Sequence, residues 1–244
     1  MKPIKIFMTS WNRKHIIEKT INFLYERTRT PFELHVYDNG SRDDTKNFLL
    51  EKLNEKLITS LHLDNRNTGC LYDKFVFHSM VENDEKYYVV TDNDIMPPQV
   101  SPVDWLGQMI TVMDREPKLA ALCPQMPLVG LMGPEYIRND LVICKAVGNF
   151  FKVVRRDAFP VEKFVQKLMA FGDDGWLCQE LRTAGWEVAF LKNMYCYNLE
   201  GDYDDWGYIK EDLDKDPRKA GYGKPVRYLP LDWNTLTPPP ELRF

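Results

Sequence analysis

Apolar and polar residues alternate in two different ways along the first hundred residues. Four short runs rich in apolar, β-branched and aromatic residues read IKIFMTS, FELHVYD, ITSLHLD and KYYVVTD, which is typical of buried strands. Between them, apolar residues recur at helical spacing over about residues 14–27, 42–55 and 70–82. This order predicts an α/β fold with an open, mostly parallel twisted sheet and helices on both faces.

The alternation is less regular in the second half of the chain. DWLGQMITVMDRE predicts a helix, KLAALCP a strand, and the Pro/Gly-interrupted residues 124–134 a loop. CKAVGNFFKVVRRDAF predicts strand structure, DDGWLCQELRTAGW a helix closed by Gly185, and EVAFLK a last strand. We therefore expect one folded unit over residues 1–200, with two halves meeting near residue 100. The acidic, aromatic and then proline-rich residues 201–244 predict an irregular C-terminal extension that could act as a lid.

The stretch VYDNGSRDDT ends the second predicted strand with acids and turn-forming residues. Asn39-Gly40 can mark a tight hairpin, but no second alternating strand follows it. Instead, Ser41 and Asp44 match a capping box at the start of a helix. Ligands of open α/β sheets bind at the carboxyl ends of parallel strands, so Asp38 and Asn39 are candidate ligand-binding residues.

A second polar strand end is YYVVTDNDIMP, where Asp92 and Asp94 flank Asn93. Alternation along a strand places both carboxylates on one side, and such a pair attracts Mg²⁺ or Mn²⁺, which also binds phosphate oxygens and water. This predicts a metal–diphosphate site, although a solvated loop explains D-x-D alone equally well. An EF-hand is disfavoured because its loop needs glycine at the sixth position, where this chain has Pro97.

A third acidic motif, FGDDGW, lies at the start of the last predicted helix. Acids are common there because the helix dipole stabilises them by about 0.3–1 kcal/mol. Phe171, Trp176 and a glycine on each side of Asp173 and Asp174 favour a functional role. A partly desolvated carboxylate at this place could have a raised pKa and act as a general base.

Composition limits the classes of protein to consider. The chain has 244 residues, 44% of them hydrophobic, and a net charge of −4 without a long Lys or Arg run, which argues against binding duplex nucleic acid. Its five cysteines are scattered and form no C-x-x-C pair, so neither a disulfide framework nor a zinc site is predicted, and a reducing cytoplasm fits best. No apolar run is long enough to span a bilayer, which leaves peripheral membrane association open.

Taken in order, VYDNGSRDDT, the NRNTG that ends at Gly69, the D-x-D and the DD helix start resemble family-2-like glycosyltransferases of the GT-A (Rossmann-like) fold over about residues 4–198. The resemblance implies a nucleotide-sugar donor, usually a UDP-sugar, with Mn²⁺ or Mg²⁺ and inversion at the anomeric carbon. It also implies a hydroxyl-bearing acceptor, which could be a glycan, a lipid-linked glycan, a protein or a modified base.

The resemblance also implies roles for individual residues. The residues at donor-binding positions are Thr9, Ser10, Trp11, Arg13, Asp38, Asn39, Asn67, Gly69, Lys74, Asp92 and Asn93. Asp38 resembles the carboxylate that binds the base, and an acceptor-only group suits a pyrimidine N–H. Arg13 resembles the basic residue beside the diphosphate, while Lys74 stands where the family usually has an arginine facing the phosphates.

Asp94 resembles the direct metal ligand, Asp92 the residue that reaches ribose or water, and Asp174 the catalytic base, with Asp173 as the alternative. One departure concerns the metal. The family often has a histidine ligand after the last strand, but here Asn198 is nearest to that place. An amide oxygen can bind Mg²⁺ or Mn²⁺ only weakly, so the resemblance leaves the affinity for metal in question.

Other classes of protein fit the sequence less well. Because the histidine is missing, a non-catalytic nucleotide-sugar binder or a degenerate subunit of the same fold stays open. Phosphatases of the haloacid-dehalogenase type carry D-x-D on the first strand, not the fourth. Nucleotidyltransferases of this fold usually have a Gly-rich N-terminal loop, and dinucleotide-binding oxidoreductases need G-x-G-x-x-G after the first strand; this chain has neither.

Overall fold

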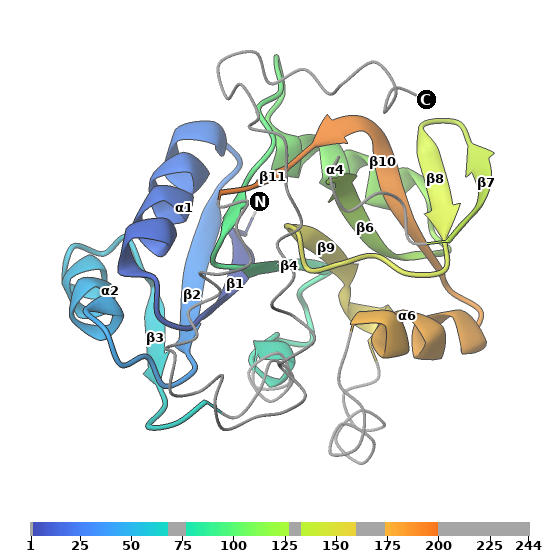
Figure 1. Ribbon diagram of the computed structural model, residues 1–244. Helices are drawn as coiled ribbons and strands as arrows, with labels where there is room; N and C mark the ends of the chain where they lie inside the picture. Colours follow the sequence, from blue (N-terminus) through green and yellow to red (C-terminus); the bar gives the residue numbers. More distant parts are fainter. Residues whose placement is uncertain (1, 68–76, 127–132, 160–173, 200–244) are drawn as a thin grey trace, which may run out of the picture.

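The computed structural model describes residues 2–67, 77–126, 133–159 and 174–199. A nine-stranded sheet with the order β3-β2-β1-β4-β9-β6-β10-β8-β7 runs through this part of the chain (Figure 1). Its strands are β1 (Ile4–Ser10), β2 (Phe32–Asp38), β3 (Ser60–Leu63), β4 (Tyr87–Asp92), β6 (Leu119–Gln125), β7 (Pro134–Arg138), β8 (Leu141–Cys144), β9 (Lys152–Arg155) and β10 (Glu187–Tyr195). The described helices are α1 (Lys14–Arg27), α2 (Thr45–Asn54), α4 (Trp105–Arg115), α6 (Asp174–Thr183) and the 3₁₀ turn η1 (Arg156–Ala158).

The sheet is mixed but mostly parallel, as the sequence predicts. Strand β1 pairs in parallel with β2 and β4, β2 with β3, and β6 with β10. Strand β9 lies antiparallel between β4 and β6, and β8 lies antiparallel to β10. The carboxyl ends of β1, β2 and β4 therefore meet at one edge, where the first two polar motifs stand.

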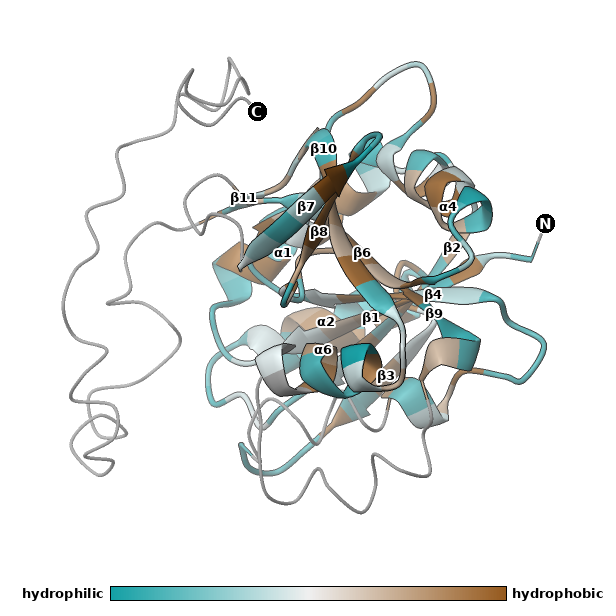
Figure 2. Cartoon of the chain, turned by 90° about the vertical axis from the view of Figure 1, so that its right-hand side faces the viewer, coloured by the Kyte–Doolittle hydropathy of each residue, from teal (hydrophilic) through white to brown (hydrophobic). Residues whose placement is uncertain are grey.

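Helices cover both faces of the sheet, which confirms the predicted layers. In β1, Ile6 and Met8 belong to the core cluster that includes the buried residues of α1, α2 and α4. Phe7, between them, points to the opposite face and stacks on Phe77. Helix α6 adds Cys178 and Leu181 to the apolar cluster of β6, β8 and β10 on that opposite face. Figure 2 shows hydrophobic residues along β8 and both hydrophilic and hydrophobic residues on α4 and α6.

Local predictions have mixed outcomes. The helix over 14–27 is confirmed as α1, whereas α2 starts at Thr45 and most of the predicted helix over 70–82 lies outside the described residues. The capping box is wrong. Asp44 is the N-cap residue of α2 and makes no capping side-chain bond, while Ser41 bonds to the loop that precedes it.

The structure adds elements that the pattern did not predict. Strands β7 and β8 form an antiparallel hairpin across Asn139 and Asp140, inside a stretch where only the last residue of β8 was predicted to be strand. A two-stranded sheet joins β5 (Ile95–Met96) to β11 (Tyr197–Asn198). Figure 1 shows β11 reaching back from β10 toward α1, and this pairing brings Asn198 to the D-x-D loop.

Two general expectations can be compared with the described residues. Their four cysteines, at 123, 144, 178 and 196, are buried and free. Among these residues, no helix has the length and apolar character needed to cross a membrane. The predicted extension over 201–244 lies outside the described residues.

Candidate functional site

The carboxyl ends of three neighbouring strands form the floor of the site. The parallel register places Ser10 opposite Asp38 and Thr9 opposite Asp92. Thr9 Oγ1 donates a hydrogen bond of 3.1 Å to Asp92 Oδ1. Two inter-strand spacings separate β2 from β4, a distance of about 10 Å. Two motifs that lie more than fifty residues apart in the chain therefore face one ligand-sized edge.

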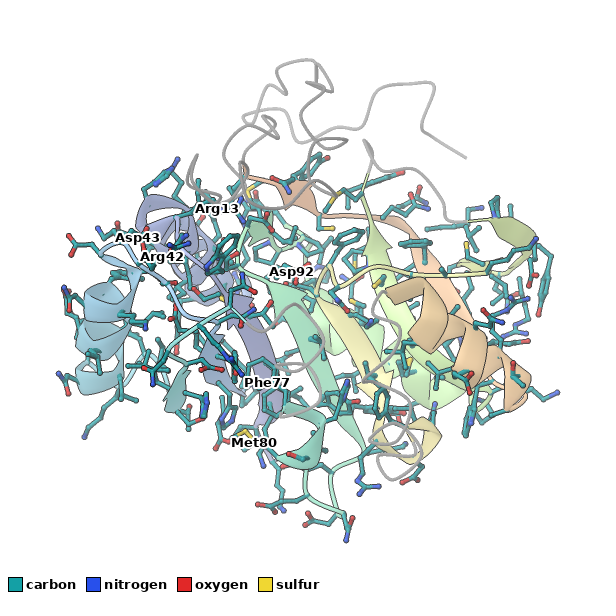
Figure 3. The ribbon with its side chains drawn as sticks, turned by 60° about the horizontal axis from the view of Figure 1, so that its bottom comes forward. Arg13, Arg42, Asp43, Phe77, Met80 and Asp92 are labelled. Atoms are coloured by element: carbon teal, nitrogen blue, oxygen red, sulfur yellow. The ribbon has the colours of Figure 1, made fainter. Side chains whose placement is uncertain are left out.

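The loop after β1 is fastened to the loop after β2. The Asn12 N–H donates to Ser41 Oγ at 2.7 Å, and Asn12 Oδ1 accepts from the Arg42 N–H at 2.7 Å. Asp43 Oδ2 accepts from the Lys14 N–H, the first residue of α1, at 3.2 Å. Figure 3 shows Arg13, Arg42 and Asp43 close together where these loops meet. The two loops therefore act as one rigid rim.

This rim holds an unusual backbone. Asn12 and Arg13 have φ values of 52° and 61°, so two successive non-glycine residues are left-handed. Such conformations cost about 1–3 kcal/mol each and persist only where surrounding contacts enforce them. Arg13 is also the N-cap of α1, and its carbonyl accepts from the N–H groups of Ile16 and Ile17. This enforced backbone conformation sets the position from which the Arg13 side chain extends.

Asp38 lies inside the turn that follows β2. Its side chain is fully buried; Oδ1 accepts from the Ser41 N–H at 2.9 Å, and Oδ2 accepts from the Ser41 hydroxyl. Burial raises the pKa of Asp38, while the bonds from Ser41 act in the opposite direction. In this arrangement Asp38 stabilises the turn, and a base could reach the carboxylate only if the turn opened.

Asn39 and Gly40 complete the turn. Asn39 Nδ2 donates to Asn67 Oδ1 at 3.2 Å, which places an amide pair beside the end of β2. Gly40 has a φ of 79°, and a Cβ added there would lie 2.4 Å from the Arg66 carbonyl carbon. Only glycine fits this close approach between the β2 turn and the segment that carries Asn67.

Charged and amide groups converge at the end of β4. Arg13 Nη2 lies 3.1 Å from Asp94 Oδ2 and 3.4 Å from Asn93 Oδ1. Asn198 Nδ2 lies 3.4 Å from the same Asp94 oxygen. The Arg13 and Asp94 side chains are only 10% and 14% exposed, so this contact is largely shielded from water.

The residues here fit a hard divalent cation. Asp92, Asp94 and an Asn198 amide turned to present its oxygen would supply oxygen donors, and Mg²⁺ normally adds only one or two carboxylates to phosphate oxygens and water. Within the described ranges, no group of three or more His, Cys, Asp or Glu side chains forms a metal cluster. A cation bound here would therefore need further ligands, such as phosphate oxygens or water.

Helix α6 is linked to this edge through the loop between β8 and β9. Its second turn contacts the loop between β8 and β9, because the Val147 N–H donates to Cys178 Sγ at 3.4 Å. Two residues further on, the Asn149 carbonyl accepts from the Asp92 N–H at 3.1 Å. The main chain of Asp174 starts this helix, but its side chain is not described, and Asp173, Gly69 and Lys74 lie outside the described residues.

Two further candidates, Ser10 and Trp11, lie at the carboxyl end of β1. Ser10 is buried, and its hydroxyl has no hydrogen-bond partner within the part of the chain that the structure describes. Trp11 is half-buried beside it. A buried hydroxyl without a hydrogen-bond partner costs free energy.

Sequence reasoning missed three residues that shape the site. Asn12 locks the rim, and its position directly after a strand is a signal, because asparagine tolerates the left-handed backbone better than most residues. Asn149 and the buried Lys152, whose Nζ donates to Asn149 Oδ1 at 2.6 Å, support the end of β4. No local sequence signal marks this pair, since it depends on where β9 inserts into the sheet.

The open, mostly parallel sheet of the described residues matches the GT-A fold of solved structures. The family model described as glycosyl transferase family 2 matches residues 5–171, and the chain belongs to this family. This membership agrees with the resemblance that its motifs carry.

Solved structures with the same fold are similar only at low sequence identity. The mannosyltransferase PcManGT from Pyrobaculum calidifontis, in complex with GDP-Man and Mn²⁺, has a TM-score of 0.60 and 15% identity over 80% of this chain and 56% of its own. GalNAc-T7 with UDP, GalNAc and Mn²⁺ has a TM-score of 0.60 and 10% identity over 80% and 43%. S. aureus TarS 1-349 in complex with UDP-GlcNAc has a TM-score of 0.56 and 14% identity over 87% and 64%. The chain thus spans less than two thirds of each of these neighbours.

Proposed function

We propose that this glycosyltransferase moves a sugar from a nucleoside-diphosphate donor, most simply a UDP-sugar, to a hydroxyl acceptor with inversion, and that it depends on Mn²⁺ or Mg²⁺. The observation that carries the proposal is the convergence of Arg13 and Asn198 on Asp94. These residues bring a positively charged guanidinium and oxygen atoms that can bind a metal ion to one point of the strand edge. Neighbours of the same fold were solved with UDP, UDP-GlcNAc or GDP-Man, two of them with Mn²⁺.

The geometry supports a direction for the donor. Asp94 and Arg13 at the end of β4 suit the diphosphate, while the Asn39–Asn67 amide pair at the end of β2 suits the base. Thr9, Ser10 and Trp11 would line the nucleotide between these two places, and Lys74 would add a second positive charge. In this arrangement Asp38 serves the base indirectly, because its carboxylate holds the turn that presents Asn39.

The proposed chemistry is a single displacement. A bound divalent cation supplies Lewis-acid neutralisation of the leaving diphosphate, with Asp94 as its direct ligand and Asp92 and Asn198 in support. Arg13 stabilises the negative charge that develops as the diphosphate departs. Asp174 accepts the proton of the acceptor hydroxyl, whose oxygen attacks the anomeric carbon from the opposite face.

Asp174 is proposed as the base because its helix is linked to the end of β4. The loop over residues 147–149 contacts both the second turn of α6 and the Asp92 N–H, which supports a place for the start of α6 near this edge. Asp173 is the alternative if Asp174 proves dispensable.

Hydrolysis and transfer assays test the proposal. The full chain with Mn²⁺ should slowly release sugar from at least one member of a panel of UDP- and GDP-sugars, and excess EDTA should stop this release. A protein that only binds nucleotide sugars would show ligand binding without release of sugar. Full activity in EDTA would remove the metal from the mechanism.

Compartment, acceptor and tail complete the proposal. The buried free cysteines support a cytoplasmic reaction. The acceptor hydroxyl could belong to a glycan, a lipid-linked glycan, a protein or a modified base.

Residues 201–244 are proposed as an extension that closes over the donor, and a chain truncated after residue 200 should then lose transfer. Unchanged transfer would make the extension a spacer.

A further inference from the structure

The Asp94 carboxylate already has a cationic partner in the structure. Arg13 Nη2 lies 3.1 Å from Asp94 Oδ2, the oxygen that Asn198 also contacts. A guanidinium is charged at every accessible pH, and both side chains are largely shielded from water. Arg13 thus occupies one of the two Asp94 oxygens that the proposed metal could bind.

The position of Arg13 is built into the fold. Its backbone is left-handed, as is that of Asn12, and Asn12 is held by the Ser41 hydroxyl and the Arg42 N–H. A second contact, to Asn93 Oδ1, keeps the guanidinium at the D-x-D loop. An arginine that served only as a surface charge would not require two strained residues. The strain therefore argues that the position of the Arg13 side chain matters for function.

A divalent cation and a guanidinium that bind the same carboxylate lie close together and repel each other strongly. A diphosphate at the same place changes this balance, since it offers the guanidinium other oxygens to bind, often in a bidentate manner. The cation and the diphosphate should therefore favour each other's binding beyond their direct contact.

We propose that Arg13 is a positioning residue that competes with the divalent cation for Asp94 and moves from Asp94 to the diphosphate when the donor binds. The inference rests on the proposed function of this site. Two consequences follow: the cation alone binds weakly, and the diphosphate raises the affinity for the cation. Binding linkage is reciprocal, so the cation raises the affinity for the diphosphate by the same factor.

The test measures Mn²⁺ binding to the full chain by electron paramagnetic resonance, with and without UDP, in the wild type and in Arg13→Gln. Removing the competitor should raise the affinity for Mn²⁺ alone about tenfold, within the roughly 5–150-fold range of typical coupling. The factor by which UDP improves Mn²⁺ binding should shrink. A residue that only bound the diphosphate, or only shaped the loop, would not raise the affinity for Mn²⁺ alone.

Lys14→Gln is the matched control, because it removes one positive charge from the neighbouring residue. Its Nζ lies 2.7 Å from Glu18 and not at Asp94, so the affinity for Mn²⁺ should stay at the wild-type value. Arg13→Asn is a second variant that suits the left-handed backbone and should behave like Arg13→Gln if the latter folds poorly.

The outcomes separate the inference from the proposed function. An unchanged or lower affinity for Mn²⁺ alone in both folded Arg13 variants overturns the competition while leaving the metal site intact. An equal gain in Lys14→Gln would reduce the effect to general charge and also overturn it. No Mn²⁺ binding in any variant, even with UDP, would instead remove the metal from the proposed function.

Discussion

The two halves of the sheet bury polar residues for different purposes. At the carboxyl ends of β1, β2 and β4 the buried polar residues are Ser10, Asn12, Asp38, Asn39, Ser41, Thr91 and Asn93. In the other half, Arg155 is typical: its guanidinium donates to the carbonyls of Met113, Glu116 and Leu119 and so closes the end of α4. The first half uses buried polar groups to shape the strand-end edge, whereas Arg155 in the second half bonds to the backbone of its own half.

Energetically unfavourable features of the described residues lie together at the strand-end edge. Parallel strands β1, β2 and β4 deliver their ends to one edge, and that edge carries strained residues and the partnerless Ser10 hydroxyl within the described chain. The β6–β10 half contains the antiparallel strands β8 and β9, and its loop over 147–149 reaches the edge to support Asp92. We expect substitutions at the edge to affect activity and substitutions in the other half to affect mainly stability.

The largest expected effect comes from Asp174→Asn, at the start of α6. Loss of a general base typically lowers the rate by about 10²–10⁴-fold. Transfer should fall by that amount while UDP binding, measured by titration calorimetry, stays unchanged. Asp157→Asn, an exposed carboxylate in η1, is the control and should retain wild-type transfer. If Asp174→Asn turned over at near the wild-type rate, Asp174 would not be the general base, and Asp173 would be the next candidate.

Asp94→Ala should have the next largest effect. Removing the proposed direct ligand of the cation should lower transfer by about 10²–10³-fold, the typical loss when one group that stabilises a developing charge is removed. Steady-state assays at saturating Mn²⁺ measure this. Asp84→Ala removes an exposed carboxylate that pairs with Lys2 and should leave transfer unchanged. Equal losses in both variants would show that the effect is not specific to the site.

Substituting one glycine in each half compares how much stability each position contributes. Gly40→Ala combines a positive φ with a Cβ 2.4 Å from the Arg66 carbonyl carbon, so it should lower the free energy of unfolding by about 2–4 kcal/mol. Gly185→Ala, after α6, also has a positive φ, but a Cβ there would meet no atom within 4 Å, so about 1 kcal/mol is expected. Urea denaturation measures both values. Equal losses would mean that the close approach at Gly40 relaxes freely.

Two buried carboxylates should respond to pH with opposite signs. Burial raises the pKa of Asp38 above its usual 3.8, so its contribution to stability is present at low pH and falls as pH rises through the raised value. Burial also acts to raise the pKa of Asp104, the N-cap of α4, but hydrogen bonds from Gly107, Thr30 and Arg29 outweigh it, and the pKa is lowered. Its contribution is present above about pH 4 and is lost as pH falls through the lowered value.

The variants Asp38→Asn and Asp104→Asn measure this contrast. Over roughly pH 3–7, the stability lost in Asp104→Asn should grow with rising pH, because the native carboxylate is then ionised and fully bonded. The stability lost in Asp38→Asn should shrink over the same range. Losses that change in the same direction would contradict the assigned environments.

Much of the β1–β4 half could be predicted from its sequence because its structure follows local patterns. Strand runs and helical spacing gave β1, α1 and β2, and the parallel order placed Asp38 and Asp92 at one edge. The burial of the Asp38 carboxylate could not be predicted. In the sequence Ser41 resembles a helix cap, but in the structure its N–H and hydroxyl donate to Asp38.

The other half was harder to predict because its pairings are not local. Asn139 and Asp140 are turn residues between two short strands, and Asn139 has a φ of 55°, so a hairpin signal exists but lies in a stretch without clear alternation. The insertion of β9 between β4 and β6 has no sequence signal at all. For the same reason the sequence suggested Asn198 near the metal but not that β11 pairs with β5 to bring it there.

Thermal unfolding of the wild type and Asp94→Ala with UDP, in the presence and absence of Mn²⁺, tests the central claim most directly. A ligand that binds only the native state raises the melting temperature, so UDP with Mn²⁺ should stabilise the wild type well beyond UDP alone. Asp94→Ala should lose this Mn²⁺-dependent gain. An equal gain in both proteins, or no gain for any nucleoside diphosphate, would contradict a cation–diphosphate site at the end of β4.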